Sequence, residues 1–207
     1  MTTTERSGVV LAGGHSRRFG QQDKALAELD GEPMLKRVVE RTSPVVDELL
    51  VSCREAQRAS FEAVLDSAAG SVEFVTDPEP GAGPLAGVNA ALQHTSGEYV
   101  AVVACDIPAV DPEFLAFLFE QASGREAAVP RLQGGTPQPA LAVYEAAAMR
   151  RVSTALLNEG VRRFRSALDE LDVRFVAPEE VEARTEWHTL HNVNTPEELA
   201  ELEDELR

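Results

Sequence analysis

Lysine is almost missing from this chain. It occurs only at Lys24 and Lys36, and every other cationic side chain apart from histidine is an arginine. Positive charge as a whole is scarce, because 19 Lys and Arg stand against 35 Asp and Glu, giving a formal net charge of −16. Nucleic acids and anionic membranes select basic surfaces, so the composition argues against binding to either. An acidic, lysine-poor surface is typical of a protein that works in strong salt.

Cysteines are few, and long apolar runs are absent. Cys53 and Cys105 are the two cysteines and each stands alone in apolar surroundings, which predicts two buried free thiols in a reducing compartment. No apolar run approaches the roughly 20 residues of a membrane helix. Residues 1–10 show no apolar signal region. We therefore expect a cytoplasmic location and no contact with a membrane.

What the chain does have is a regular alternation of short apolar runs and amphipathic segments. The runs at 8–13, 48–53, 72–77 and 99–106 are continuously apolar, as expected of strands covered on both faces. This pattern predicts a Rossmann-like α/β sandwich of three layers with a mostly parallel sheet. Helices are predicted at 33–43, 55–69, 84–96, 111–123, 146–160, 165–171 and from 196 onward, and further strands at 127–132, 139–145 and 173–178.

No linker or repeat divides the sequence, so we expect one domain over residues 1–207. Ligands of open α/β sheets lie at the carboxyl ends of the strands. We therefore expect a ligand-binding half over about 1–110 and a second half over about 111–207 that faces another substrate.

A glycine-rich turn follows the first predicted strand, in the stretch VVLAGGHSRRFGQQDKALAEL from Val9 to Leu29. Glycines allow backbone N–H groups to approach an anion closely. Arg17, Arg18 and Lys24 could then supply charge to phosphate oxygens. The spacing fits neither the Walker loop nor the G-x-G-x-x-G fingerprint. The turn thus predicts a polyphosphate site, with an ordinary strand-to-helix turn and solvated arginines as the alternative.

Two aspartates end predicted strands at the same edge of the sheet. Asp77 ends the third strand and Asp106 ends the fourth. Mg²⁺ prefers oxygen ligands and commonly takes one or two carboxylates together with phosphates. These residues are therefore candidates to hold a nucleotide and its metal, although an aspartate at a strand end can also be a turn cap.

The glycine turn resembles the signature of the molybdenum cofactor guanylyltransferases and their nucleotidyltransferase relatives, roughly L-A-G-G-x-S-x-R-[MF]-G-x-x-D-K-A-L. The match runs without a gap from Leu11 to Leu26. Four later stretches resemble family motifs in family order, so the resemblance covers residues 11–199. These stretches are DPEPGAGPLAGV (77–88), CDIP (105–108), GGTPQPALAVY (134–144) and HNVNTPEEL (191–199).

The resemblance implies roles for particular residues. Arg18, Lys24 and Asp106 would be catalytic, and Asp106 would bind Mg²⁺. Nucleotide contacts would fall on Leu11, Ala12, Gly13, Gly14, Lys24, Asp77, Gly83, Pro84, Leu85 and Asp106. Acceptor contacts would fall on Gln138, Arg162, Arg163, Asn192 and Asn194. An Asx turn at the two asparagines and an exposed helix start at the two arginines are the alternatives.

The implied reaction is transfer of GMP from GTP to molybdenum-molybdopterin, with release of pyrophosphate. Molybdoenzymes or other proteins of cofactor biosynthesis would be possible protein partners. The Gly-Gly pair favours guanylyl over cytidylyl transfer, because cytidylyl relatives tend to read L-A-A-G. The alternatives are another nucleotide or phosphorylated acceptor, and a non-catalytic module that binds and delivers nucleotide or cofactor.

One position departs from the family pattern. The family often places a polar residue such as asparagine just after the second strand, near the base. Here the chain reads Ser52-Cys53-Arg54. The resemblance therefore leaves that contact unassigned or passes it to the backbone.

Overall fold

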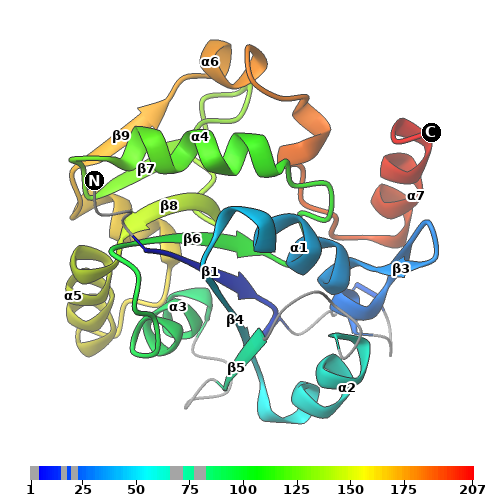
Figure 1. Ribbon diagram of the computed structural model, residues 1–207, viewed down its shortest axis with the longest axis horizontal. Helices are drawn as coiled ribbons and strands as arrows, with labels where there is room; N and C mark the ends of the chain where they lie inside the picture. Colours follow the sequence, from blue (N-terminus) through cyan, green and yellow to red (C-terminus); the bar gives the residue numbers. More distant parts are fainter. Residues whose placement is uncertain (1–4, 15–17, 20–22, 66–71, 77–82) are drawn as a thin grey trace.

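A seven-stranded sheet forms the centre of the protein in the computed structural model, which describes residues 5–14, 18, 19, 23–65, 72–76 and 83–207 (Figure 1). The strand order is β5-β4-β1-β6-β8-β7-β9. These strands are β1 (Arg6–Leu11), β4 (Glu48–Cys53), β5 (Val72–Thr76), β6 (Tyr99–Ala104), β7 (Ala127–Pro130), β8 (Leu141–Glu145) and β9 (Val173–Val176).

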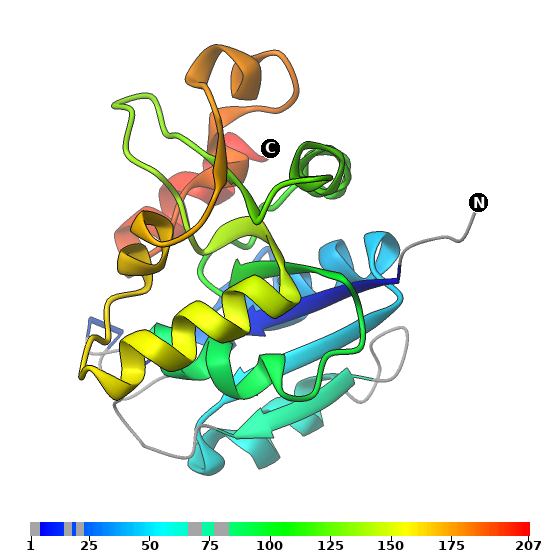
Figure 2. The ribbon, with the colours of Figure 1, turned by 90° about the vertical axis from the view of Figure 1, so that its left-hand side faces the viewer.

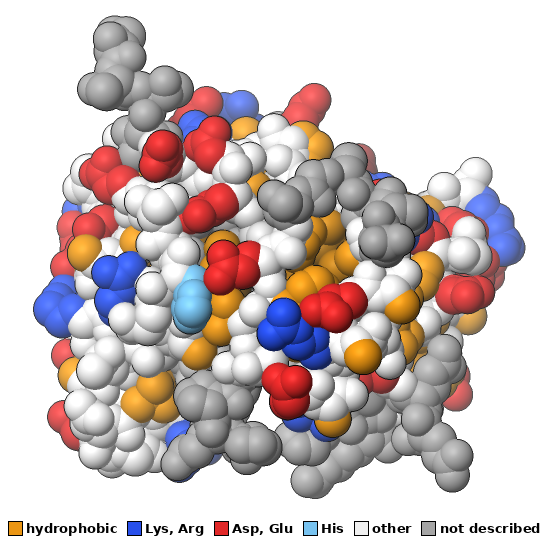
Figure 3. All heavy atoms as spheres, turned by 60° about the horizontal axis from the view of Figure 1, so that its bottom comes forward, with side chains coloured by type: hydrophobic (Ala, Val, Ile, Leu, Met, Phe, Trp, Pro, Cys, Tyr) orange, Lys and Arg blue, Asp and Glu red, His pale blue; other side chains and the backbone are white. Residues whose placement is uncertain are grey.

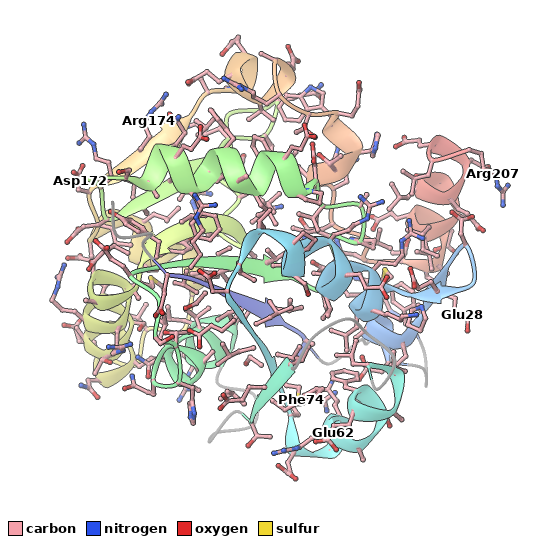
Figure 4. All side chains as sticks on the ribbon, viewed as in Figure 1. Glu28, Glu62, Phe74, Asp172, Arg174 and Arg207 are labelled. Carbon is pink, nitrogen blue, oxygen red and sulfur yellow. The ribbon has the colours of Figure 1, made fainter. Side chains whose placement is uncertain are left out.

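Strand direction divides this sheet into two parts. β5, β4, β1 and β6 are mutually parallel, as the alternation of strands and helices predicts. β8 pairs antiparallel with both β6 and β7, and β7 pairs parallel with β9. Phe74 on β5 and Arg174 on β9 lie near the two opposite edges of the sheet (Figure 4).

Helices cover both faces of the sheet, which confirms the predicted layered α/β class. One face packs against α1, α2 and α4, and its core contains Val10, Val51 and Val103. The other face packs against α3 and α5, which lie side by side, and its core contains Val9 and Leu50 (Figure 2). Successive residues of a strand thus enter different cores, as alternation of side chains requires. The helices are α1 (Met34–Thr42), α2 (Glu55–Leu65), α3 (Pro84–Leu92), α4 (Pro112–Ala122), α5 (Ala146–Asn158), α6 (Pro178–Glu182) and α7 (Pro196–Glu205).

A hairpin with strands of two residues each and four short 3-10 helices complete the described elements. The hairpin joins β2 (Glu28–Leu29) to β3 (Glu32–Pro33) through Asp30 and Gly31, which both have positive φ. It packs with α1 and α7 in a small third core that includes Leu29, Met34 and Leu202. The 3-10 helices are η1 (Lys24–Leu26), η2 (Ser43–Val45), η3 (Phe164–Asp169) and η4 (Trp187–Leu190).

Several predicted boundaries are corrected by the structure. The helix predicted over 165–171 is the 3-10 helix η3, and the helix predicted over 84–96 ends at Leu92. Pro33 precedes α1 as its N-cap and belongs to β3, so the first helical residue is Met34. The strand predicted over 127–132 ends at Pro130.

Surface charge follows the acidic composition. On the face in Figure 3, acidic side chains are spread widely, and the basic side chains of the described residues are scattered among them without forming one broad patch. Among the described helices, none has the length and apolar character needed to cross a bilayer.

Candidate functional site

A cavity of about 600 Å³ opens at the carboxyl ends of β1, β4 and β6. Leu11, Ser52 and Ala104 are register partners on these three strands, so the strands end at one level. Each contributes to the wall, and the chain segments that follow them complete it. The lining residues are Leu11, Gly13, Gly14, Lys24, Ser52, Gly83, Pro84, Gly87, Ala104, Cys105, Asp106, Ala140 and Asn192.

An ion pair between Lys24 and Asp106 forms the charged part of this wall. Lys24 Nζ lies 2.6 Å from Asp106 Oδ2, and the two side chains are 16% and 17% exposed. Asp106 follows β6 directly. Lys24 is the first residue of η1, whose N-cap Asp23 accepts a hydrogen bond from Ala25 N. Two residues that are 82 positions apart in the sequence therefore meet at the cavity.

Two asparagines from the segment before α7 join this pair. Asn192 Nδ2 donates to Asp106 Oδ1 at 2.7 Å, and Lys24 Nζ donates to Asn194 Oδ1 at 3.2 Å. Val193 N donates to the main-chain oxygen of Asp106 at 2.7 Å, which fixes the segment against the end of β6. Gln138, which is 9% exposed, donates from Nε2 to Asn192 Oδ1 at 2.5 Å. These bonds orient both oxygens of the Asp106 carboxylate.

Side chains from the start of α2 hold the glycine turn. Arg54 donates from Nε to Gly13 O and from an Nη to Gly14 O, both at 3.2 Å. Gln57 Nε2 donates to Ala12 O at 3.1 Å and to Asp23 Oδ2 at 2.6 Å. The carbonyl oxygens of three consecutive residues are therefore bonded from one side.

The N-terminus of α3 forms another part of the wall. Gly83 is its N-cap with φ +86°, and Pro84 is its first helical residue. Proline suits this position because it has no N–H that would need a helical partner. A Cβ on Gly83 would lie 3.1 Å from the main-chain oxygen of Arg162, so the chain at Arg162 passes close by. Free N–H groups at a helix N-terminus favour anionic ligands.

The structure gathers most of the predicted site residues at this cavity. Those that line it are Leu11, Gly13, Gly14, Lys24, Gly83, Pro84, Asp106 and Asn192. Asn194 reaches it through its bond to Lys24, and Gln138 through its bond to Asn192. Because Gln138 is buried and bonded to Asn192, its observed place is behind the wall, whereas the sequence predicted a direct contact with the acceptor.

Other predicted residues are placed elsewhere. Leu85 is fully buried in the core beneath α3, so its side chain faces away from the cavity. Ala12 is also buried, and its N–H and carbonyl oxygen bond to Ser52 and Gln57. The polar main-chain groups of Ala12 are thus occupied within the protein, whereas a nucleotide contact by Leu85 stays a prediction for its main-chain N–H at the start of α3.

The predicted cationic residues Arg18, Arg162 and Arg163 are exposed and do not belong to the cavity wall. Arg162 nevertheless lies beside the N-cap of α3, as the close approach to Gly83 shows. Asp77, which was predicted to contact the nucleotide, and Arg17 lie outside the described residues.

Sequence reasoning missed the parts of the site that depend on tertiary contacts. Gln57 carries no sequence signal, because a glutamine in the first turn of a helix is common. Arg54 lies where the chain departs from the family pattern, and this departure was the one feature of the sequence that could have indicated a role for Arg54. Asp23 lies inside the glycine-turn motif, but its role as N-cap of η1 becomes visible only in the structure.

Cys105 lines the cavity next to Asp106. Burial, together with the adjacent Asp106 charge, raises the pKa of its thiol well above the ordinary value. A thiol in this state remains protonated near neutral pH and is a poor nucleophile. The chemistry of the cavity must therefore depend on charge and position more than on a covalent intermediate at this residue.

The donor set of the cavity suits a hard cation that brings other ligands with it. Asp106 offers a carboxylate and Asn194 offers an amide oxygen next to Lys24, whereas Asn192 turns its amide nitrogen to Asp106 and its oxygen to Gln138. Within the described residues, no cluster of three His, Cys, Asp or Glu side chains could hold a metal ion unaided. Mg²⁺ commonly takes one or two carboxylates and completes its shell with water and substrate phosphates, so these residues fit that ion.

Comparison with known proteins gives a consistent assignment. The family model described as MobA-like NTP transferase domain matches residues 8–173. Two proteins named "Probable molybdenum cofactor guanylyltransferase" are each 36% identical to this chain. The one from Haloferax mediterranei aligns over 199 residues, with 96% of this chain and 93% of its own length covered. The one from Natronomonas pharaonis aligns over 202 residues, with 98% of each covered.

A solved structure shares the whole architecture. The crystal structure of molybdopterin-guanine dinucleotide biosynthesis protein A from Archaeoglobus fulgidus superimposes with a TM-score of 0.80 at 30% sequence identity. The match covers 97% of this chain and 98% of that one. These matches show that the chain belongs to the MobA-like NTP transferase family. The glycine turn, the Lys24–Asp106 pair and the segment with Asn192 and Asn194, which meet at one cavity, are consistent with this assignment.

Proposed function

We propose that this protein transfers GMP from GTP to molybdenum-molybdopterin and releases pyrophosphate, forming a guanine dinucleotide cofactor. The names of the relatives from Haloferax mediterranei and Archaeoglobus fulgidus support this reaction. The observation that carries it here is the meeting of Lys24 and Asp106 at a cavity lined by Gly13 and Gly14. A glycine turn, a cation and a carboxylate at one edge of a parallel sheet suit a nucleoside triphosphate.

The reaction forms one phosphorus–oxygen bond and breaks another. An oxygen of the acceptor phosphate attacks the α-phosphorus of GTP, the bond from that phosphorus to the bridging oxygen of the β-phosphate breaks, and pyrophosphate leaves. Catalysis of such a step depends on alignment and on neutralising charge that develops on the phosphate oxygens. Lys24 supplies one cation for these oxygens, and Arg18 is the proposed second one.

Mg²⁺ is the proposed metal, with Asp106 as its protein ligand. When bound, it would neutralise phosphate charge and polarise the α-phosphoryl group. Gln138 orients Asn192, and Asn192 orients the Asp106 carboxylate, so the side chain that would meet the metal is held in a fixed direction. In the structure, the Lys24 ammonium lies next to that carboxylate.

The acceptor is proposed to enter from the side of the cavity formed by residues 111–207, while residues 1–110 hold the nucleotide. Asn192, Arg162 and Arg163 are the polar groups offered to it from that half. The main chain of Arg162 lies beside the helix N-terminus at Gly83, so an acceptor bound by this segment would lie close to the nucleotide phosphates.

A pyrophosphate-release assay tests the proposal. The protein is incubated with Mg²⁺, molybdenum-molybdopterin and, in separate reactions, GTP, CTP, ATP or UTP. We expect release with GTP that depends on both metal and acceptor. Pyrophosphate release with CTP and not with GTP would assign cytidylyl transfer in place of guanylyl transfer. Binding of a nucleotide without pyrophosphate release for any acceptor would favour a delivery module over an enzyme.

A further inference from the structure

Three consecutive carbonyl groups of the glycine turn are bonded to the start of α2. Gln57 holds Ala12 O, and Arg54 holds both Gly13 O and Gly14 O. A loop that makes such bonds to a helix has a defined peptide orientation, and this one borders the cavity.

The orientation of these carbonyls fixes the orientation of the N–H groups. In a trans peptide the C=O of one residue and the N–H of the next point in opposite directions, and no cis peptide occurs among the described residues. With Ala12 O and Gly13 O directed to α2, the N–H groups of Gly13 and Gly14 point away from α2. Within the described part of the chain, neither N–H bonds to another residue. Both glycines line the cavity, so N–H groups that point away from α2 are available to an anion bound there.

The two side chains that hold the turn are themselves fixed. Arg54 N donates to Gln57 Oε1 at 2.9 Å, and Gln57 is only 5% exposed. The carboxylate of Asp23 accepts from Gln57 at 2.6 Å and lies 3.6 Å from an Arg54 Nη. Asp23 also caps η1, the helix that begins with Lys24. One set of contacts therefore sets both the N–H groups of the turn and the start of the segment that carries the catalytic lysine.

We propose that Arg54 and Gln57 are positioning residues for nucleotide binding. They hold the Ala12–Gly14 backbone with its N–H groups directed at the triphosphate, and through Asp23 they align η1. They act through the backbone and do not contact the phosphates. This inference rests on the proposed function, because it assigns residues that prepare the same nucleotide site.

Preorganisation accounts for the expected effect. A turn that already presents its N–H groups needs no ordering when the triphosphate binds, so loss of the holding side chain should weaken binding. Removing a residue that orients a ligand-binding group typically weakens binding on the order of 10- to 100-fold. We expect Arg54→Met to raise the Kd and KM for GTP by about 10-fold or more. Since Arg54 does not touch the reacting atoms, kcat and the KM for the acceptor should stay near their wild-type values.

The Arg54→Lys variant distinguishes a positioning role of Arg54 from a direct effect of its charge on the phosphates. Lysine keeps the positive charge, but its single ammonium cannot reproduce the planar fork that bonds two carbonyls at once. If Arg54 acts through the turn, Arg54→Lys should bind GTP nearly as weakly as Arg54→Met. Recovery of wild-type affinity by lysine would show that the charge acts directly on the phosphates and would overturn the proposal.

A matched control lies within α2, four residues after Arg54. Arg58 pairs with Glu62 one turn later, and its side chain is 44% exposed. Glu62 lies at the outer margin of α2 in Figure 4. Arg58→Met removes the same side chain without touching the glycine turn, so it should leave the KM for GTP unchanged. Gln57→Met provides a second test, because it removes the bond to Ala12 O and keeps a similar volume.

The measurement is calorimetric titration of GTP into each variant, together with steady-state kinetics and a thermal melt. The proposal is overturned if Arg54→Met and Gln57→Met both bind GTP as the wild type does. A fall in kcat and a rise in the KM for the acceptor as large as the rise in the KM for GTP would indicate a loosened fold. That result would also overturn the proposal. If the wild-type protein binds none of the four triphosphates, the proposed function is wrong, and this inference fails with it.

Discussion

The two sides of the cavity are built in different ways. On the glycine side, backbone carbonyls are held by long side chains from the next strand–helix connection, about 40 residues later. On the Asp106 side, the carboxylate is held by side chains, with Lys24 82 positions before it and Asn192 86 positions after it. The first side is a backbone structure encoded by a contiguous motif, whereas the second is assembled from distant residues. Substitutions should therefore affect binding on the first side and turnover on the second.

Asp106→Asn should produce the largest effect. The change keeps the shape of the side chain but removes the charge that pairs with Lys24 and would hold the metal. We expect kcat to fall by about 1,000-fold, a loss typical of removing a central electrostatic group. Pyrophosphate release measures it, and a thermal melt shows whether the fold is intact. A kcat within a few-fold of wild type would exclude Asp106 as the metal ligand.

Lys24→Met should come next. It removes the ammonium that bonds Asp106 and Asn194, and we expect kcat/KM for GTP to fall by about 100-fold. The double variant with Asp106→Asn should lose less than the two single losses combined, because the residues act as one unit. Additive losses in this cycle would show that the pair does not cooperate in the reaction.

Gln138→Met tests the residue behind the wall. It removes the bond that orients Asn192, so we expect kcat to fall by about 10-fold while the KM for GTP stays unchanged. Gln133 is exposed on the same loop, which makes Gln133→Met the matched control. A rise in the KM for the acceptor without a change in kcat would restore the original assignment of Gln138 to acceptor binding.

Gly83→Ala should have a moderate effect. Gly83 has φ +86° and ψ 173°, a region that is essentially restricted to glycine, so alanine there costs about 1–3 kcal/mol of folding free energy. Its Cβ would also lie 3.1 Å from the main-chain oxygen of Arg162. This close contact would push the segment at Arg162 away from the N-terminus of α3. Gly124 has a φ of +74° and open space around it, so Gly124→Ala should show the strain alone. We expect the larger loss of unfolding free energy in Gly83→Ala, and a raised KM for the acceptor only in that variant.

Glu48→Gln should have the smallest effect on activity, because Glu48 lies at the opposite end of the same strands. Burial raises the pKa of Glu48, but hydrogen bonds from Ser7, Ser96 and Gly97 outweigh that effect and lower the net pKa below its ordinary value. A carboxyl with a depressed pKa stabilises the fold above about pH 4.5, and this contribution is lost as the pH falls through the folded-state pKa.

The variant should therefore be less stable than wild type at pH 7, and the difference should shrink as the pH falls below about 4.5. Denaturant titrations at several pH values measure this difference. Pyrophosphate release should remain at the wild-type level. Reduced turnover would show that the two ends of the strands are coupled.

The contrast between the two sides also explains what the sequence could predict. The four parallel strands and the glycine turn were predictable, because each is a short contiguous pattern. Lys24 was predictable from the motif of the glycine turn, and Asp106 from its place at the end of the fourth predicted strand, with both expected at the same edge of the sheet. The Gln138–Asn192 bond and the clamp by Arg54 depend on how separate segments pack, and no local pattern encodes that packing.

Some fold details were missed for physical reasons. The hairpin at Asp30 and Gly31 has two-residue strands, which are too short to produce an alternating pattern, although Asp-Gly is a recognised turn pair. The antiparallel direction of β8 follows from its connection to β7 and has no signature in composition. The helix at 84–96 was predicted too long because residues 93–96 contain no proline or glycine that would mark its end.

The bond between Lys24 and Asn194 spans 170 positions of the chain. During translation, Lys24 and Asp106 leave the ribosome well before their amide partners do. A nascent chain can pair the first parallel strands early, but it cannot finish the charged wall until residue 194 has cleared the exit tunnel. A chain that ends before residue 194 should thus lack the amide partners of Lys24 and Asp106 and leave the charged wall of the cavity incomplete.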